Sequence, residues 1–141
     1  MNESGFGTGF DKTVGMDYPE MTAERTVVTC EITPELLQPY GIVHGGVYCS
    51  LVESAASLGA ALWYGERGHV VGVANHTNFL RAIGSGTVTA TATPIHRGRT
   101  QQLWLVKVTD DTGRDIARGE VRLANLPADG AGSPDTSERD A

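Results

Sequence analysis

The chain contains one stretch with the periodicity of a helix, at residues 46–64. Apolar residues recur there at spacings of three and four, which places them on one helical face: Val47, Leu51, Ala55, Leu58 and Leu62. Gly65 follows, and glycine is the preferred residue just past a helix end. We therefore predict a long helix that begins near Gly45 or Gly46, ends at about Tyr64, and packs its apolar face on a sheet.

The segments on either side of this helix have the composition of β-strands. Residues 25–33 are rich in β-branched residues. After the helix, four segments show full or partial alternation of apolar and polar residues: 69–83, 86–98, 99–111 and 113–126. The short turns between the last three predict antiparallel connections. Before the helix, Thr33 and Pro34 predict a short helical turn that Pro39 ends.

The order of these elements predicts an α+β protein with an antiparallel sheet and one long helix. With 141 residues the chain is long enough for one packed domain, which we place at residues 21–126. Residues 1–20 are predicted to be a loose arm that can gain order by packing on the domain, and residues 127–141 a disordered acidic tail. Because one helix hides only one face of a sheet, we expect self-association to cover the other.

Composition and charge narrow the function. The net charge of −6 disfavours a general nucleic-acid binder, and no apolar stretch is long enough to span a membrane. The first residues lack the cationic and apolar regions of a secretory signal, so we expect a cytoplasmic protein. Cys30 and Cys49 lie outside any CxxC pattern and are predicted to be reduced and buried. The four histidines lack metal-ligand spacing, so no metal site is predicted.

A single carboxylate interrupts the long helix. Glu53 is the only charged residue between His44 and Glu66. A helix with so few charges is predicted to be buried on nearly all sides, where a carboxylate is unfavourable unless it has partners or a task. Glu53 lies opposite the apolar stripe, and Ser57, four residues on, shares its face. The alternative is that Glu53 only forms a salt bridge with an arginine at a subunit contact.

The segment GIVHGG supplies a candidate anion site before the helix. His44 precedes Gly45 and Gly46, where free backbone N–H groups and the positive end of the helix dipole are offered to an anionic oxygen. This arrangement suits an oxyanion hole, although glycine pairs also serve turns and a histidine there also caps helices. Motifs of zinc hydrolases, serine hydrolases and nucleotide-binding loops are absent. A carboxylate facing backbone donors suits hydrolysis of an activated carbonyl by nucleophilic or general-base attack.

Three segments carry a family resemblance: GIVHGGVYCSLVESAAS, VVGVANHTNFLRAI and GTVTATATPIHRGRTQQLWLVKVTDDTGR. Together they resemble the hotdog-fold acyl-CoA thioesterases of the phenylacetate-degradation type, especially the 4-hydroxybenzoyl-CoA thioesterase branch that uses a helix glutamate. The similarity extends from about Met21 to Leu126. It implies a hotdog fold, in which an antiparallel sheet of five or six strands wraps around the helix. It also implies a dimer joined edge to edge into one continuous sheet.

The resemblance implies a site formed by two subunits. By this resemblance, Glu53 attacks the thioester carbonyl or activates water, and Ser57 matches a hydroxyl that orients water, where the most similar branch has threonine. Gly45 would supply the oxyanion N–H, Gln38 would contact the thioester region, and His44 would support the loop. In this family, the residues matching Gln38 and Gly45 come from one subunit, and those matching Glu53 and Ser57 come from its partner.

Basic residues near a hairpin are candidates for the phosphates of coenzyme A. The turn HRGRT lies close to the strand that Arg81 ends, and guanidinium groups suit phosphate. The resemblance places CoA phosphates near this turn, whose candidate residues are Arg97, Gly98, Arg99 and Thr100. A solvated basic turn is the alternative. Asn75 and His76 resemble acyl-pocket positions, or else they are strand residues at a subunit boundary.

The expected activity is hydrolysis of an acyl-CoA thioester to a carboxylic acid and free CoA. The expected assembly is a homodimer, or a homotetramer built as a dimer of dimers. Coenzyme A is part of the substrate, and no metal or other cofactor is expected. Two alternatives stay open: a non-catalytic acyl-CoA-binding hotdog protein, and a hotdog hydratase or dehydratase, which pairs a histidine with an acid in a different motif order.

Overall fold

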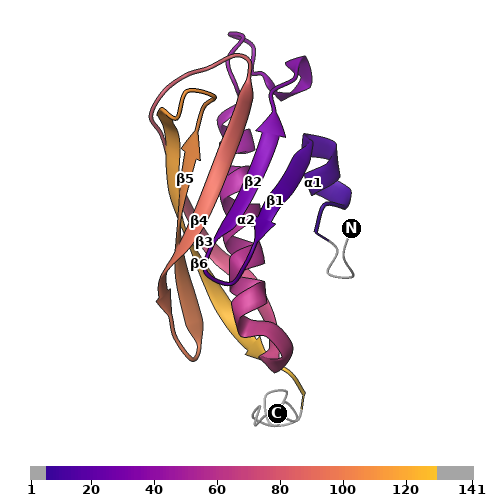
Figure 1. Cartoon of the computed structure of the whole chain (residues 1–141), viewed down its shortest axis with the longest axis vertical. Coiled ribbons are helices and arrows are strands. Elements are labelled where there is room, and N and C mark those ends of the chain that lie inside the picture. The colour runs from indigo at the N-terminus through magenta and orange to yellow at the C-terminus, as the bar shows by residue number, and fades with distance from the viewer. Residues whose placement is uncertain (1–5, 130–141) are drawn as a thin grey trace, which may run out of the picture.

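One long helix, α2 (Gly45–Tyr64), lies against a six-stranded antiparallel sheet in the computed structural model, which describes residues 6–129 (Figure 1). The strands lie in the order β1-β2-β4-β5-β6-β3. Their bounds are Met16–Met21 (β1), Thr26–Glu31 (β2), Gly68–Phe79 (β3), Thr87–Arg97 (β4), Gln101–Thr109 (β5) and Asp115–Pro127 (β6). The described residues also form the short helices α1 (Gly9–Val14), η1 (Pro34–Leu36) and η2 (Gly65–Arg67). A sheet wrapped around one helix is the predicted architecture.

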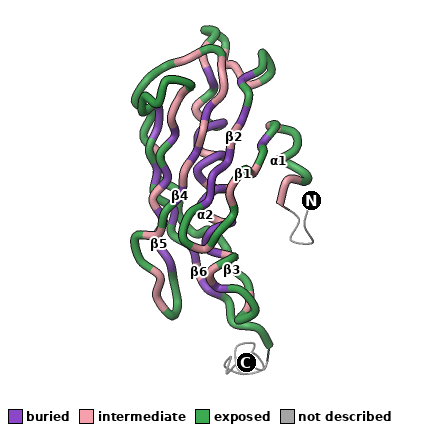
Figure 2. The backbone as a smooth tube through the Cα atoms, viewed as in Figure 1, coloured by how far each residue is buried: buried purple, intermediate pink, exposed green. Residues whose placement is uncertain are grey.

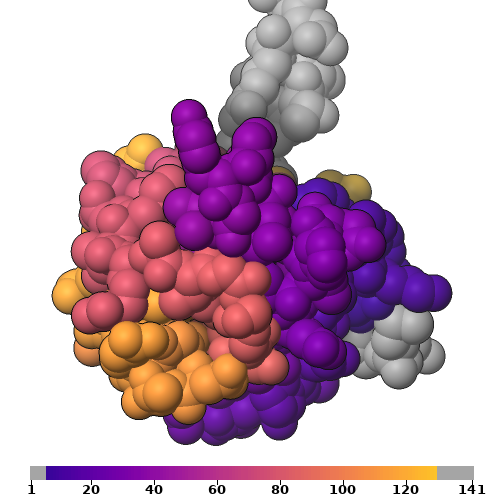
Figure 3. All heavy atoms as spheres, turned by 90° about the horizontal axis from the view of Figure 1, so that it is seen from above, coloured from indigo at the N-terminus to yellow at the C-terminus, as the bar shows by residue number. Residues whose placement is uncertain are grey.

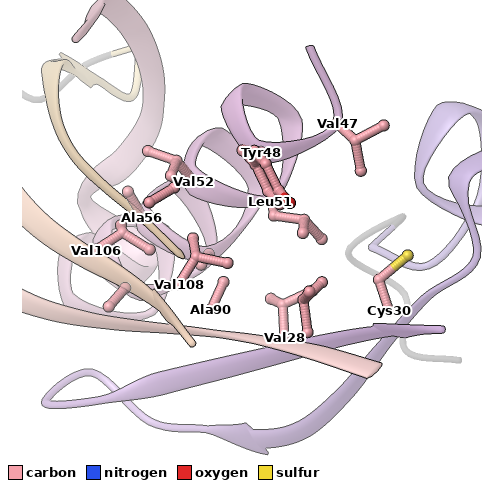
Figure 4. Packing of buried hydrophobic residues seen from close by; sticks show 14 of the residues in the cluster. Val28, Cys30, Val47, Tyr48, Leu51, Val52, Ala56, Ala90, Val106 and Val108 are labelled. Atoms are coloured by element: carbon pink, nitrogen blue, oxygen red, sulfur yellow. The ribbon is translucent and has the colours of Figure 1, made fainter. Parts of the chain in front are cut away.

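The core lies between α2 and the concave face of the sheet. Strand β4 shows how the sequence builds it, because Val88, Ala90 and Ala92 are fully buried while the threonines that alternate with them are not. Figure 4 shows α2 residues, including Leu51 and Val52, packed over small apolar residues of the strands. Alanine and valine on the sheet let the helix approach closely.

The predicted apolar stripe of α2 is confirmed except at its end. Val47, Leu51, Ala55 and Leu58 are buried, but Leu62 is 43% exposed. Ala60 and Tyr64 are buried at that end of the helix instead. Because the sheet is twisted, the side of the helix that faces it changes from turn to turn. Cys30 is buried as predicted, whereas Cys49 is only half-buried.

Residues 6–20 of the predicted N-terminal arm pack on the domain and belong to it. Strand β1 pairs with β2, and α1 precedes it. The Asp11 carboxylate accepts hydrogen bonds from the Tyr18 hydroxyl and from Ser54 Oγ on α2, the latter at 3.0 Å. The predicted domain boundary at residue 21 is therefore wrong, because the arm contributes an edge strand to the sheet. The predicted tail lies outside the described residues from residue 130 onward, and its first residue, Pro127, ends β6.

Strand β3 forms one edge of the sheet and is widely exposed. Only three of its twelve residues are even partly buried, and Figure 2 shows how it differs from the inner strands. Val73 is 53% exposed and Phe79 is 57% exposed. A long apolar edge with unpaired backbone groups is the kind of strand that natural proteins cover or pair.

Two loops, the connections between β2 and α2 and between β3 and β4, meet at one end of the molecule, beside the start of α2. The Val43 N–H donates to the Ile83 carbonyl at 2.9 Å, and the Ile32 N–H donates to the Gly86 carbonyl at 2.8 Å. Figure 3 looks down on this end, with the purple segment around η1 lying against the salmon strand region.

None of the helices within residues 6–129 is long and apolar enough to cross a membrane.

Candidate active site

His44 caps the N-terminus of α2. Its Nδ1 atom accepts a hydrogen bond from the Gly46 N–H at 2.8 Å, and its carbonyl oxygen accepts from the Val47 N–H at 2.9 Å. The neighbouring Gly45 N–H donates to no acceptor within residues 6–129. This N–H is one of the donors that the start of a helix leaves unpaired, and it is available to an external oxygen. His44 thus orders the loop as a helix cap.

A hollow of about 360 Å³ lies beside Gly45. It brings together three predicted site residues, Gln38, Gly45 and Arg81, with Phe79 and other apolar residues. A Cβ atom on Gly45 would lie 2.6 Å from the Phe79 ring, so glycine allows this close approach. Gln38 accepts a hydrogen bond from the Tyr40 N–H through Oε1, which leaves its amide NH2 group to donate.

Tyr48 forms part of the wall of this hollow and was not singled out from the sequence. Its side chain is 3% exposed, and its ring centroid lies 6.0 Å from that of Phe79. Its hydroxyl has no hydrogen-bond partner among the described residues. Burial raises the pKa of this hydroxyl above its ordinary value. No sequence signal distinguishes Tyr48, because a tyrosine on an apolar helix face resembles any core residue.

Glu53 lies about two turns after Gly45 on α2 and faces strand β3. Its Oε2 accepts a hydrogen bond from Asn75 Nδ2 at 3.0 Å, and the same nitrogen donates to the Cys49 carbonyl at 3.1 Å. In turn, Asn75 Oδ1 accepts from Thr77 Oγ1 at 2.8 Å. A Cβ atom on Gly72 would overlap Glu53 Oε1. Within residues 6–129 the carboxylate is therefore held by an amide, and it forms no ion pair with an arginine.

The prediction that α2 is buried on nearly all sides is wrong on this face. Glu53, Ser54 and Ser57 are half-buried, because the sheet covers the opposite face of the helix and β3 ends the sheet here. Ser57 lies one turn after Glu53, and its hydroxyl has no protein partner in the described part of the chain. Both side chains are thus open to a ligand or to water.

Glu53 and Gly45 belong to different parts of one chain's surface. They are eight residues apart on α2, which at the rise of a helix separates their backbones by about 12 Å along its axis. A carboxylate side chain cannot close that gap to meet a carbonyl held at the Gly45 N–H. Within a single chain, therefore, Glu53 does not form one reaction centre with Gln38 and Gly45.

The basic turn after β4 divides into engaged and free residues. Arg97 donates to both carboxylate oxygens of Glu24, at 3.2 and 3.0 Å, and to the Ala23 carbonyl at 2.9 Å. Arg97 is thus paired with the turn between β1 and β2, and its role toward CoA stays a prediction. The Asn125 side chain donates to the carbonyls of Gly98 and Arg99, which fixes the turn. The Thr100 carbonyl accepts a hydrogen bond from the Asn125 backbone N–H. Arg99 forms no ion pair within residues 6–129.

The structure separates Asn75 from His76, which the sequence analysis grouped as acyl-pocket residues. Asn75 faces Glu53, whereas His76 lies on the outer face of the sheet, in a small hollow with Arg118 and Glu120. Alternation along a strand makes this separation unavoidable for neighbours. The residues that the sequence analysis missed, Gly72 and Thr77, lie on the Glu53 side.

Among the described residues, no group of three or more histidine, cysteine, aspartate or glutamate side chains is placed to hold a metal ion.

Comparisons with known proteins identify relatives over most of the chain. The family model described as the thioesterase superfamily matches residues 40–117. The protein Rv1847 of Mycobacterium tuberculosis is 52% identical over 122 residues, which cover 84% of this chain and 87% of that protein. Its solved structure matches with a TM-score of 0.83 over 84% of this chain and 97% of that one.

Two further relatives are named as thioester hydrolases. A 1,4-dihydroxy-2-naphthoyl-CoA hydrolase of Listeria monocytogenes is 39% identical over 116 residues, covering 82% of this chain and 94% of the hydrolase. A thioesterase of Staphylococcus aureus matches with a TM-score of 0.81 and 29% identity, over 85% of this chain and all of that one. The latter was solved in two variants, one with a glutamate and the other with a glutamine replaced by alanine.

Proposed function

This chain belongs to the thioesterase superfamily and is a thioester hydrolase, and from that premise we propose that it hydrolyses acyl-CoA with Glu53 as the catalytic carboxylate. The observation that carries the proposal is the setting of Glu53. It is the only charged side chain of α2, and it stands on a face open to ligands with one oxygen held by Asn75 at 3.0 Å. The family assignment favours hydrolysis over non-catalytic binding of acyl-CoA and over hydration.

The proposed active site is shared between two subunits. Glu53 and Ser57 come from one chain, and Gln38, Gly45 and its supporting His44 come from the partner. The separation of about 12 Å within one chain supports this division, and the exposed apolar edge of β3 supports a pairing that brings a second copy against Glu53. A dimer joined through β3, or a dimer of such dimers, would provide the complete site.

A relative supports the pairing of Gln38 with Glu53. In the Staphylococcus aureus thioesterase, the glutamine and the glutamate that were replaced are fifteen positions apart. Gln38 and Glu53 have the same separation here. The match supports a joint role for the two residues, one as a donor to the thioester region and the other as the reacting carboxylate.

The proposed chemistry follows from the donors and acceptors of this site. Glu53 either attacks the thioester carbonyl carbon or removes a proton from a water molecule that attacks it. The carbonyl oxygen gains negative charge, which the Gly45 N–H and the positive end of α2 stabilise. The carbon–sulfur bond then breaks, and CoA leaves as a thiolate that takes up a proton. In the first route, water oriented by Ser57 hydrolyses the resulting anhydride and restores the Glu53 carboxylate.

The proposed contacts with coenzyme A use two arginines, Arg81 and Arg99, that form no ion pair within residues 6–129. Arg81 lines the hollow beside Gly45, and Arg99 projects from the turn that Asn125 fixes. Guanidinium groups at these positions suit the phosphates of CoA. Gly98 and Thr100 contribute by shaping this turn, while Arg97 acts indirectly by anchoring it to Glu24.

Replacement of Glu53 tests the proposal. Thiol release from aryl, medium-chain and long-chain acyl-CoA substrates should fall to near background in Glu53→Ala, because the reacting carboxylate is gone, while the assembled mass and the melting temperature stay unchanged. Glu66→Ala, an exposed glutamate just past the end of α2, is the matched control and should retain full turnover. Unchanged thiol release in Glu53→Ala would overturn the assignment. Loss of assembly in Glu53→Ala would instead indicate a structural salt bridge at a subunit contact.

A further inference from the structure

The polar contacts of Glu53 extend beyond its first partner into strand β3. Thr77 Oγ1 donates to Asn75 Oδ1 at 2.8 Å, and Asn75 Nδ2 donates to Glu53 Oε2 at 3.0 Å. Asn75 and Thr77 are two residues apart, so they lie on the same face of the strand. Taking Glu53 as the catalytic carboxylate proposed above, we infer that Thr77 and Asn75 form a positioning relay that fixes this carboxylate and leaves Oε1 as its reacting oxygen.

The orientation of the Asn75 amide is determined by its surroundings. Its nitrogen faces two acceptors, the Cys49 carbonyl at 3.1 Å and the Glu53 carboxylate. An amide turned by half a rotation would place its oxygen against both acceptors and would lose both hydrogen bonds. The Thr77 hydroxyl donates to the oxygen on the other side and stabilises the same orientation. The Thr77 donor therefore helps to keep the Asn75 donor directed at Glu53.

Two glycines in strand interiors make room for this relay. A Cβ atom on Gly72 would overlap Glu53 Oε1, and one on Gly119 of β6 would lie 2.7 Å from Thr77 Oγ1. Glycine inside a strand weakens it and often marks a close approach. Neither glycine has a positive φ angle, so the backbone does not require glycine at either position. Space for Glu53 accounts for Gly72. Space for Val52 and Thr77 together accounts for Gly119, because its added Cβ atom would also lie 2.6 Å from Val52 Cγ1.

A bulge in β3 completes the geometry. The register between β3 and β6 shifts between Gly72 and Ala74. In a regular strand, residues 72 and 75 would point to opposite faces, because side chains alternate. The bulge places Gly72 and Asn75 on the same side, under Glu53, which is the re-aiming of side chains that bulges provide near active sites.

The relay makes the two carboxylate oxygens unequal. Oε2 is occupied by Asn75, so it is restrained, while Oε1 lies over the bare backbone of Gly72. A neutral amide donor restrains the carboxylate without neutralising its charge, which an arginine would do. A carboxylate held in this way loses less freedom on reaching the transition state, so the relay acts on kcat more than on KM.

The Thr77 hydroxyl distinguishes a positioning role of Asn75 from a role of Asn75 in binding the acyl group. Thr77 donates to Asn75 and makes no hydrogen bond with Glu53 itself, so a substrate-binding role for Asn75 alone would not depend on Thr77. The full-length, assembled enzyme is compared as Thr77→Val, which keeps the shape and removes the hydroxyl, and as Thr77→Ser, which keeps the hydroxyl. Thr91→Val is the control. It makes the same chemical change away from the site, on the face of β4 that is turned away from the core.

Each variant is assayed with the acyl-CoA of the panel that the unaltered enzyme hydrolyses fastest. Thr77→Val should lose roughly 3- to 10-fold in kcat, the value of one neutral hydrogen bond, with KM unchanged. Thr77→Ser should restore most of that loss, and Thr91→Val should match the unaltered enzyme. Asn75→Ala, which removes a hydrogen bond to a charged group, should lose roughly 10- to 100-fold in kcat.

Two results would overturn the relay. One is full kcat in Asn75→Ala, a result that is informative even if the threonine variants do not fold. The other is a loss in both variants that falls in KM alone, because it would place Asn75 in contact with the substrate. Inactive Glu53→Ala together with fully active Asn75→Ala would reject the relay and leave the proposed function standing, whereas active Glu53→Ala would reject the proposed function first.

Discussion

Two tyrosine hydroxyls, one on the half-buried Tyr18 and one on the buried Tyr48, show how differently this chain satisfies similar groups. The Tyr18 hydroxyl donates to the Asp11 carboxylate, and burial followed by this hydrogen bond raises its pKa above the ordinary value. The Tyr48 hydroxyl is buried beside the proposed site and has no partner among the described residues. A buried hydroxyl without a partner destabilises a fold, whereas one bonded to a charged group stabilises it.

The pair yields a stability prediction. Tyr18→Phe should lower the free energy of unfolding by about 1–3 kcal/mol, because it removes a hydrogen bond to a charged group. Tyr48→Phe should leave the free energy of unfolding unchanged or raise it by about 1 kcal/mol, because it removes an unpaired polar atom. Thermal unfolding of both variants measures the contrast. An equal loss in the two would contradict it and would mean that Tyr48 has a partner in solution.

The residues of the site were predictable to different degrees. Glu53 follows from its isolation in an apolar helix, and its contact with Asn75 joins two residues that the sequence analysis singled out for different reasons. Thr77 and Gly72 were not predicted, because their roles depend on the bulge in β3, which alternation cannot locate. A glycine within a strand pattern and a threonine two residues after Asn75 were the available signals.

The start of α2 is the element on which the oxyanion proposal depends. Gly45 is the first helical residue, and the residue before it, His44, has φ −61° and ψ 132°. That conformation is the one that a following proline requires, and proline is favoured at the first helical position. The Gly45 N–H can therefore be deleted by substitution without breaking the helix.

Gly45→Pro and Gly45→Ala form a matched pair. Both add a Cβ atom near the mobile end of the Phe79 side chain, but only proline removes the N–H. We expect Gly45→Pro to lose roughly 100- to 1,000-fold in kcat, the usual effect of removing one oxyanion donor, and Gly45→Ala to lose much less. Steady-state kinetics on assembled protein measures the difference. Equal kcat values for the two variants would reject the Gly45 N–H as an oxyanion donor.

Elements with long periodic patterns were predicted well. Of the short elements, the helical turn at Thr33 and Pro34 was predicted and is observed as η1, whereas α1 and β1 were not predicted. Helix α2 and strands β2 to β6 lie close to their predicted ranges, because each has enough residues to show its period. The arm was predicted to be loose, since α1 and β1 have six residues each and β1 contains Pro19. Their order comes from pairing with β2 and from the contact of Asp11 with α2, which are tertiary interactions.

At the scale of the whole molecule, the proposed site is incomplete within a single chain. Its reacting carboxylate and its proposed oxyanion donor lie about 12 Å apart along α2, and its β3 edge is long, apolar and unpaired in the described chain. Self-association was predicted from the need to cover a sheet face. The exposed apolar edge of β3 supports the proposal that a second copy pairs there and completes the site.

Complementation between two inactive variants tests this shared site directly. Glu53→Ala and Gly45→Pro are co-expressed in equal amounts with different tags, and the mixed assemblies are purified beside each parent. If Glu53 of one subunit works with Gly45 of the other, a mixed dimer contains one site with both residues intact. The purified mixed dimer should then show about half of wild-type turnover per subunit. If each site lies within a single chain, no intact site can form, and turnover at the background of the parent variants would contradict the account.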